Sequence, residues 1–350
     1  MAKHSKKSKK PMGLFVFLFL LIIGFGVYYA ITHEEELQNA AFDMMGEVQI
    51  KSLKVVDQFS KTRPVAVMIN NNHQAWPHAG LEDAYITYEI IAEGGITRLM
   101  AIFKDKDTSK IGSVRSARPY FLDYALENDA IYVHFGWSED ARLDIKSLGV
   151  SNINGLTDDG AFWRDTSLKK AKEHTAFTSM ERIDKYAKEK GYWRDTNKDL
   201  LLEYSVDEID LSTREDAIKA DKVFMKYSYY TNTSYEYDSE NKVYKRFMSG
   251  TSHVDAITGE QYTYKNIIIT PIKNKSYDSY GRQKLDNIGS GNGYFVTDGY
   301  AIPITWSKEG RSSQTVYKNM DGEEIKVNDG NTFIQITPIG QELKIEGNEQ

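Results

Sequence analysis

Three arginines surround the start of a predicted helix, and their side chains are well suited to bind an anion. Arg98 follows a glycine turn, and Arg115 and Arg118 directly precede Pro119. Proline fits the first turn of a helix because its φ is fixed and its missing N–H would have no partner there. The free N–H groups of such a helix start, together with guanidinium groups, favour a phosphate or a carboxylate. The pattern therefore predicts an anion site.

Other polar residues are expected near this site because they lie at strand ends or in loops. Asn71, Asn72 and His73 follow a β-branched, strand-like run, and Arg164 and His174 lie in a long polar connection after the predicted helices. Loops held by a rigid scaffold often carry binding residues. We therefore add these five residues to the three arginines as candidates for ligand binding.

Two carboxylates, Glu89 and Glu93, allow two alternatives to anion binding. In one, they and Asp123 form a structural ion-pair network with the arginines. In the other, Glu89 or Glu93 acts with His134 in a cell-envelope hydrolase or transferase. Cleavage of a glycoside needs two carboxyl groups roughly 5 to 9 Å apart, whereas residues four apart on a strand are about 13 Å apart along the backbone. The enzyme alternative therefore requires side chains that converge.

The sequence carries no pattern typical of a metal or cofactor site. The histidines show neither HxH nor HExxH spacing, and cysteine is absent, which excludes disulfides and acylation at a cysteine. Gly289, Gly291 and Gly293 resemble a phosphate-binding loop, but a strand-like segment follows them instead of a helix. We interpret them as a flexible hairpin or bulge, and we expect neither a metal nor a cofactor.

An uncharged apolar run at residues 14–31 predicts a membrane anchor. Its 18 residues nearly span a hydrocarbon core of about 30 Å. Lysines crowd the preceding tail and three glutamates follow the run, so the positive-inside rule places the tail in the cytoplasm and the rest outside the cell. A cleaved signal peptide is the alternative. We predict a single-pass signal-anchor in the cell membrane, with the C-terminal part extracellular.

The part of the chain beyond the anchor is acidic. Without the five lysines of the tail, the formal charge changes from −6 to −11. Nucleic-acid-binding proteins are usually basic, so we exclude nucleic acid as a partner. The expected partner is an anionic envelope polymer or a peptidoglycan fragment, bound where arginines make a local positive field. A third alternative is an adaptor for another exported protein.

Composition and periodicity divide the chain into seven parts. Before residue 206, strand-like runs alternate with predicted helices, whereas after residue 220 short tyrosine-rich runs alternate with turns, which predicts an antiparallel β domain. An acidic stretch without a strong pattern separates the two regions. The predicted parts are a basic tail (1–13), the anchor (14–32), a stalk (33–62), an N-terminal α+β domain with the arginine cleft (63–205), a linker (206–219), a β-rich C-terminal domain (220–340) and a tail (341–350).

Four stretches, at residues 63–103, 111–136, 244–260 and 315–338, resemble the YerB-like family of exported bacterial proteins, a domain of unknown function with N- and C-terminal parts. The resemblance implies an α+β fold, with a layered, sandwich-type N-terminal domain joined to a smaller β-rich C-terminal domain. Members of this family are typically lipoproteins, whereas this chain has an apolar run and no cysteine. The resemblance implies no activity.

Overall fold

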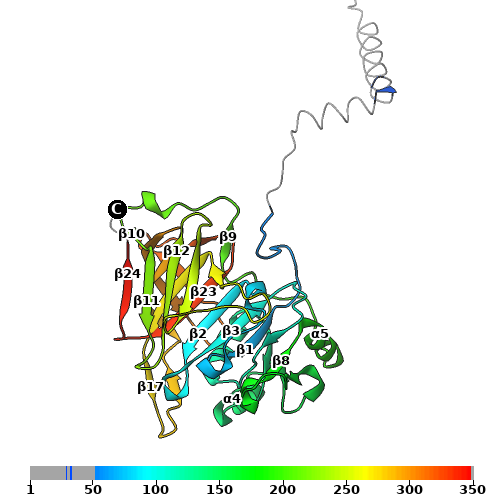
Figure 1. Cartoon of the computed structure of the whole chain (residues 1–350). Coiled ribbons are helices and arrows are strands. Elements are labelled where there is room, and N and C mark those ends of the chain that lie inside the picture. The colour runs from blue at the N-terminus through cyan, green and yellow to red at the C-terminus, as the bar shows by residue number, and fades with distance from the viewer. Residues whose placement is uncertain (1–28, 30–31, 34–51, 348–350) are drawn as a thin grey trace, which may run out of the picture. The chain divides into compact units, whose positions relative to one another are not determined.

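The structure is a computed structural model that describes residues 52–347, together with Tyr29 and residues 32–33 (Figure 1). The predicted basic tail, nearly all of the predicted anchor and residues 34–51 of the predicted stalk lie outside the described residues. Within the described part of the chain, no helix has both the length and the apolar character needed to cross a membrane. Residues Ser52–Gln350 form one compact unit, which contains the fold described below.

A mixed sheet of 11 strands runs through this unit and takes strands from both halves of the chain. Its order is β10-β20-β19-β16-β23-β2-β3-β1-β5-β6, and β21 pairs with β20. The N-terminal half supplies β1 (Val65–Asn70), β2 (Ile86–Ile91), β3 (Thr97–Phe103), β5 (Ile131–His134) and β6 (Asn152–Asn154). The C-terminal half supplies β10 (Ile218–Lys219), β16 (Asn266–Ile272), β19 (Gly289–Thr297), β20 (Tyr300–Lys308), β21 (Val316–Asn319) and β23 (Thr332–Pro338). The halves meet where β2 and β23 pair in parallel.

The glycine turn before Arg98 joins two strands of a hairpin, and the helix predicted to start at Pro119 is confirmed. β2 pairs with β3 in antiparallel orientation, and a short 3-10 turn, Glu93–Gly95, connects them. Gly94 and Gly95 adopt φ values of 67° and 74°, which glycine reaches without steric cost. From Ser52 onward, the structure describes three α-helices: α3 (Pro119–Glu127), α4 (Glu139–Ser147) and α5 (Met180–Glu189). The chain is therefore mostly β.

A second sheet of six strands is antiparallel, as predicted for the C-terminal region. It contains β11 (Lys222–Lys226), β12 (Asn232–Asp238), β13 (Val243–Met248), β14 (Thr251–Ser252), β15 (Thr263–Tyr264) and β24 (Leu343–Glu346). β24 lies within the segment predicted as a C-terminal tail and pairs with β11. The alternating Leu343 and Ile345 explain the strand, because both pack against buried hydrophobic side chains.

Three small sheets complete the strands. β4 (Ile111–Gly112) and β7 (Trp163–Arg164) pair with β8 (Ala176–Thr178), β9 (Glu203–Ser205) pairs with β22 (Lys326–Asn328), and β17 (Asn274–Ser276) forms a hairpin with β18 (Gln283–Leu285). The β17–β18 hairpin projects from the lower edge of the molecule in Figure 1.

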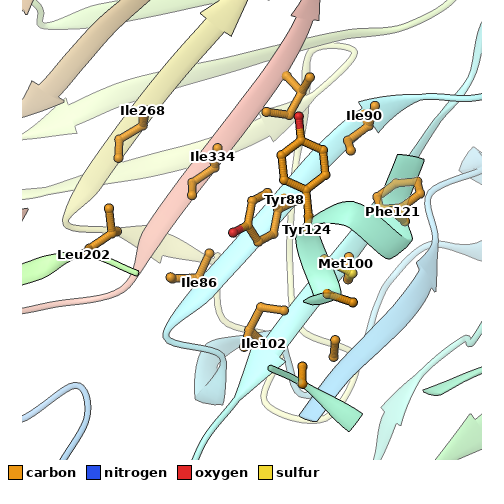
Figure 2. Close-up of a cluster of buried hydrophobic side chains, with 14 of the residues drawn as sticks. Ile86, Tyr88, Ile90, Met100, Ile102, Phe121, Tyr124, Leu202, Ile268 and Ile334 are labelled. Carbon is orange, nitrogen blue, oxygen red and sulfur yellow. The ribbon is translucent and has the colours of Figure 1, made fainter. Parts of the chain in front are cut away.

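Hydrophobic side chains bury both faces of the central sheet. On one face, Ile86, Tyr88 and Ile90 of β2 pack with Phe121 and Tyr124 of α3 (Figure 2). The residues between them on β2 point to the opposite face of the sheet, because successive side chains of a strand alternate between its two faces. That face packs against α5 and against the tyrosines of the second sheet, including Tyr235 and Tyr264. The central strands are therefore buried on both sides, and the second face also holds buried polar residues such as Glu89 and Gln335.

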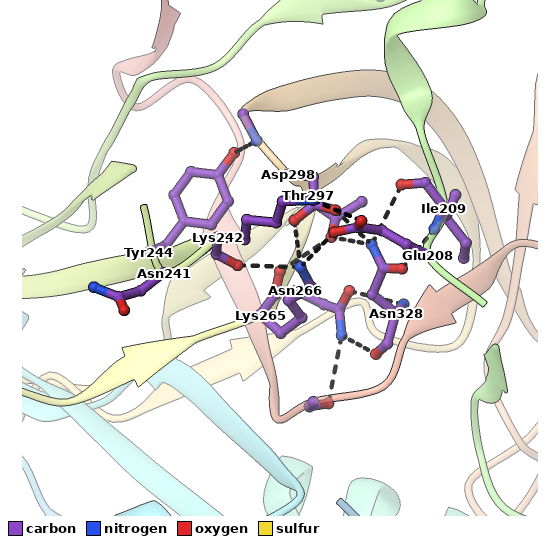
Figure 3. Close-up of polar contacts among 12 residues, drawn as sticks. Glu208, Ile209, Asn241, Lys242, Tyr244, Lys265, Asn266, Thr297, Asp298 and Asn328 are labelled. Carbon is purple, nitrogen blue, oxygen red and sulfur yellow. Dashed lines mark hydrogen bonds and ion pairs between the residues drawn. The ribbon is translucent and has the colours of Figure 1, made fainter. Parts of the chain in front are cut away.

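The predicted linker at residues 206–219 is bonded to the body of the protein. Lys242 Nζ lies 2.6 Å from Glu208 Oε2, and Ile209 N donates a hydrogen bond of 2.7 Å to Asn328 Oδ1 (Figure 3). The end of the segment forms β10, which pairs with β20 of the central sheet. The division into domains stays a prediction, and strands from both predicted domains enter one sheet.

The structured body begins before the predicted start at residue 63. Lys54 N donates hydrogen bonds of 2.9 and 3.0 Å to the Asp329 carboxylate, and the Val56 side chain is buried in the hydrophobic cluster that contains Tyr88. The segment at 289–293, predicted as a flexible hairpin or bulge, forms the first part of β19, which pairs with β20 in an antiparallel hairpin. A β-carbon on Gly293 would lie 2.2 Å from Ile269 O, so glycine permits the close approach of β16.

Candidate functional site

The three predicted arginines meet at one end of the central sheet, where β1 ends and β3 begins. Arg98 is the second residue of β3 and lies opposite Asn70, the last residue of β1. Arg115 is bound to β1 through its backbone, since Arg115 N donates to Met68 O at 2.9 Å. Arg118 caps the start of α3, whose first residue is a proline, as predicted. The strand ends and the helix start therefore bring these side chains together.

The carboxylate of Glu93 pairs with two of the three arginines. Arg98 Nη2 donates to one oxygen of Glu93 at 3.0 Å, and Arg118 Nε donates to the other. Burial opposes ionisation of Glu93, but the two guanidiniums outweigh burial and lower the pKa of this carboxyl. Glu93 is therefore ionised at neutral pH and holds Arg98 and Arg118 side by side.

Arg98 is a structural member of this cluster. Its side chain is buried, and Nη1 donates to Ser116 O at 2.5 Å. Burial, together with the nearby Arg118, lowers the pKa of Arg98 to about 10, so the side chain is still charged at neutral pH. Its Nε is buried and has no hydrogen-bond partner among the described residues. Arg98 thus carries a charge that is only partly neutralised.

Arg115 has the least engaged guanidinium of the cluster. It is half-buried and makes no hydrogen bond or close ion pair with the residues that the structure describes. Burial lowers the pKa of Arg115; Glu173 attracts its charge, and Arg118 repels it. An arginine partly removed from water without a paired carboxylate is free to donate its N–H groups to a ligand.

Arg164 joins the cluster from β7. Its guanidinium lies 4.3 Å from the centre of the Phe135 ring, and Nη1 donates to Lys172 O at 2.5 Å. Burial lowers the pKa of Arg164, and the charge of Arg115 lowers it further, which indicates that the two arginines are neighbours. Four guanidiniums therefore share three carboxylates, Glu93, the exposed Glu173 and Asp159, and one positive charge remains unmatched.

The remaining candidates for ligand binding border the cluster, and most of their polar atoms are already used. His174 is buried between the amides of Asn70 and Gln74, at 2.9 and 3.2 Å. Asn71 Nδ2 donates to Thr97 Oγ1 at 2.6 Å, and the Asn72 side chain accepts from Gln74 N at 2.9 Å as a helix cap. His73 is exposed. Asn71 and Asn72 therefore have clear structural roles.

The three catalytic candidates do not share one site. β2 ends at Ile91, so Glu93 lies in the following turn and does not share a strand face with Glu89, contrary to the prediction. β5, which carries His134, is three positions from β2 in the sheet, about 14 Å at the usual strand spacing. Burial lowers the pKa of His134 to about 4, and its Nδ1 lies 2.8 Å from Gly136 O. Glu89, Glu93 and His134 are therefore not arranged as a general acid and a general base around one substrate.

The structural ion pairs also differ from the predicted network. Glu93 pairs with the arginines as that alternative requires, whereas Asp123 pairs with Arg311 at 2.5 Å. Glu89 pairs with Arg246 at 2.7 Å, and both side chains are fully buried. Arg246 is absent from the sequence analysis, although it occupies an inward position of β13 between the buried Tyr244 and Met248. A charge at the buried phase of an alternating strand is the signal that identifies such a residue.

A chain of buried hydrogen bonds leads from Glu89 to Asn70, which lies opposite Arg98 in the sheet. Arg246 Nη1 lies 2.6 Å from His253 Nδ1, His253 Nε2 lies 2.7 Å from His78 Nδ1, and His78 Nε2 lies 2.8 Å from Asn70 O. Arginine can only donate and a carbonyl can only accept. Both histidines are therefore neutral and carry their proton on Nε2. This chain fixes the end of β1 beneath the site.

A separate pocket lies at the opposite end of β1. Its volume is about 550 Å³, and Pro64 and Tyr85 contribute to its wall. Three lysines and three carboxylates line it (Lys61, Lys104, Lys198, Asp199, Glu203 and Glu324). Because these charges balance, the pocket lacks the positive excess of the arginine cluster. Within the described part of the chain, no group of three or more histidine, aspartate or glutamate side chains is arranged to hold a metal ion.

Comparisons with known proteins agree with this architecture. Two models described as the N- and C-terminal domains of a protein of unknown function (DUF3048) match residues 52–193 and 223–334. YerB of Bacillus subtilis (strain 168), named as a candidate lipoprotein, is 34% identical over 299 residues, which is 83% of this chain and 85% of YerB. The crystal structure of the YerB protein superposes with a TM-score of 0.71 at 32% identity and covers 83% of this chain and 96% of that chain. This chain is similar to YerB, and it belongs to the DUF3048 family of proteins of unknown function.

Proposed function

We propose that this protein binds an anionic component of the bacterial cell envelope through its arginine cluster, defined as Arg98, Arg115, Arg118 and Arg164. Such a ligand is an envelope polymer or a peptidoglycan fragment that carries phosphate or carboxylate groups. The observation that carries the proposal is the free, half-buried guanidinium of Arg115 among three further arginines. A phosphate or carboxylate supplies the negative charge that the cluster lacks.

The charge distribution favours an anion site at the arginine cluster over attraction of anions by the whole protein. Beyond the apolar run, the chain carries a formal charge of −11, so a polyanion is repelled by most of the protein. Glu93 offsets part of the mutual repulsion of Arg98 and Arg118 and orients both side chains. The result is a small positive area with fixed geometry on an acidic body, which favours a ligand whose anionic group fits between the guanidiniums.

A location at the outer face of the cell membrane is part of this proposal. The apolar run at residues 14–31, with lysines before it and glutamates after it, has the features of a signal-anchor. YerB is named as a candidate lipoprotein, which would also reside at a membrane surface. In this chain the apolar run would replace a lipid attached to cysteine, since the sequence contains none.

Retention of purified envelope fractions tests the proposal. The full chain in a neutral detergent is immobilised and incubated with teichoic-type polymer and with peptidoglycan fragments at low and high salt, and the masses of the bound and unbound fragments are then measured. Binding that weakens with salt and leaves fragment masses unchanged supports the proposal. New fragment masses would show an enzyme, and failure to retain any anionic fraction would refute anion binding.

A further inference from the structure

The turn between β2 and β3 connects the arginine cluster to two aromatic segments. Glu93 pairs with Arg98 and Arg118, as described above. The next residue, Gly94, lies against the β17–β18 hairpin, since a β-carbon on Gly281 would lie 3.4 Å from Gly94 N. One residue further, a β-carbon on Gly95 would lie 3.4 Å from the Tyr230 ring. Three consecutive residues therefore bring arginines, Tyr230 and the hairpin to one place.

The aromatic side chains at this place are exposed, unlike most tyrosines of the protein. Tyr229, Tyr230 and Tyr280 are 85%, 72% and 71% exposed, whereas Tyr227 and Tyr235 of the neighbouring sheet are at most 1% exposed. The buried tyrosines build the core. The exposed tyrosines leave large ring surfaces in water, which is costly unless a ligand covers them.

Specific contacts hold both aromatic segments in position. Ser228 Oγ and Thr231 Oγ1 donate to Gly95 O at 2.5 and 2.9 Å, which fixes the short loop that carries Tyr230. Tyr277 OH donates to Asp140 Oδ2 of α4 at 2.5 Å, which attaches the β17–β18 hairpin to the helix. A preorganised aromatic surface loses little conformational entropy when it binds a ligand.

Tyr280 is the aromatic residue most closely linked to the charges. It adjoins Gly281, which lies against Gly94 of the β2–β3 turn, and its phenol is close enough to Arg115 for the two groups to interact. The Arg282 guanidinium lies 5.5 Å from the centre of the Tyr280 ring, and Arg282 pairs with Asp278 at 3.1 Å, so the ring is held within the hairpin. An aromatic ring beside a group of guanidiniums suits a ligand that has an apolar ring face next to an anionic group.

We infer that the ligand is a sugar phosphate or a polymer of such units, whose anionic group binds the arginine cluster while its sugar ring stacks on Tyr280 and Tyr230. The inference rests on the proposed function and narrows it to one chemical class. Sugar rings present a face of C–H groups that packs on aromatic rings, and their phosphates match bidentate guanidiniums. A bare polyol phosphate or a peptide carboxylate lacks the ring face.

Binding of three small probes to the full chain in neutral detergent tests the inference. The probes are N-acetylglucosamine 1-phosphate, inorganic phosphate and N-acetylglucosamine, and their binding is followed by saturation-transfer NMR and calorimetry. The sugar phosphate is expected to bind at least tenfold more tightly than either of the other two. Y280A and Y230A are expected to lower the affinity for the sugar phosphate at least fivefold and to leave phosphate binding unchanged. R115Q is expected to weaken the binding of both the sugar phosphate and inorganic phosphate.

A control and the alternative outcomes separate this inference from the proposed function. Phe59 is 77% exposed and lies between Gln58 and Ser60, which line the pocket at the opposite end of β1, so F59A removes an exposed aromatic ring without touching this site. Equal affinity for phosphate and sugar phosphate, or wild-type affinity in Y280A and Y230A, would overturn the sugar inference and leave anion binding intact. If none of the probes and no anionic envelope fraction binds, both the inference and the proposed function fail.

Discussion

Arg246 Nη2 lies 2.7 Å from Glu89 Oε2, and both side chains are fully buried between the two sheets. Glu89 lies in the N-terminal family segment and Arg246 in the C-terminal one. Burial opposes the charge of Arg246, but Glu89 outweighs burial and raises the pKa of the arginine. The pair therefore joins the two segments by a charged contact in the interior, and the hydrogen-bond chain through His253 continues from it to Asn70 at the end of β1, opposite Arg98.

Loss of Arg246 is expected to destabilise the whole body of the protein. R246M leaves Glu89 buried without a cation and leaves His253 Nδ1 without a donor, and removal of one partner of a buried pair costs about 3–5 kcal/mol. Urea unfolding followed by tryptophan fluorescence measures this cost. E89L combined with R246M removes both charges and should recover much of the lost stability. A cost for R246M below about 1 kcal/mol would contradict the role given to this pair.

The buried histidines are expected to make the protein less stable in acid. Burial lowers the pKa of His78 to about 3, and burial and the adjacent Arg246 lower the pKa of His253 well below its usual value. Below a pH of about 6.5 these histidines bind protons in the unfolded chain but stay neutral in the folded protein. The free energy of unfolding therefore falls as the pH falls. Each histidine contributes a slope of up to about 1.4 kcal/mol per pH unit, measured as unfolding free energy between pH 7.5 and pH 5.

His253 offers a matched variant for this prediction. In H253Q, the amide accepts from Arg246 and donates to His78, so the chain of hydrogen bonds is kept while one titrating group is lost. The pH slope should therefore be shallower in H253Q than in the wild type. An identical slope would exclude His253 as a source of the pH dependence. Nitrogen NMR of the wild type should find both histidines neutral, with the proton on Nε2.

The two glycines of the β2–β3 turn should differ in their sensitivity to alanine. Both have positive φ, so each substitution strains the backbone by about 1 kcal/mol. A β-carbon on Gly95 would also lie 3.0 Å from Ser228 Oγ, whereas one on Gly94 would meet open space. G95A is therefore expected to be less stable than G94A and to bind the sugar phosphate more weakly. Thermal unfolding and calorimetry measure both effects, and equal effects would show that the contact with Ser228 is unimportant.

Local patterns predicted the elements that build the site. The glycine turn and the proline start of α3 are short-range signals, and the structure has a hairpin at the first and a helix at the second. The clustering of Arg98, Arg115 and Arg118 followed from the same signals, because a strand start and a helix start next to one another bring their side chains together. Such features depend on few neighbouring residues.

Contacts between segments that are far apart in the sequence could not be predicted from these local patterns. Arg246 follows Glu89 by 157 residues, and His253 follows His78 by 175. Their contacts depend on the parallel pairing of β2 with β23, which joins the two halves of the chain in one sheet. The same limit explains why the tyrosines of the hairpin were not assigned to the site, because Gly281 and Gly94 are distant in the sequence and approach one another in the folded chain.

The central claim is that the arginine cluster binds an anion, and Arg115 tests it most directly because its guanidinium is unpaired among the described residues. R115Q should therefore fold as the wild type, with a change in unfolding free energy below about 0.5 kcal/mol. The loss of one charged hydrogen-bonding group should weaken retention of the anionic envelope polymer about tenfold or more at low salt.

The matched control is K242Q combined with K326Q, which removes two exposed positive charges outside the cluster. Retention by the full chain in neutral detergent is compared for wild type, R115Q and this control at low and high salt. We expect R115Q alone to retain less of the anionic envelope polymer, and retention by the wild type to fall as the salt concentration rises. Unchanged retention in a folded R115Q protein, or an equal loss in the lysine control, would contradict it.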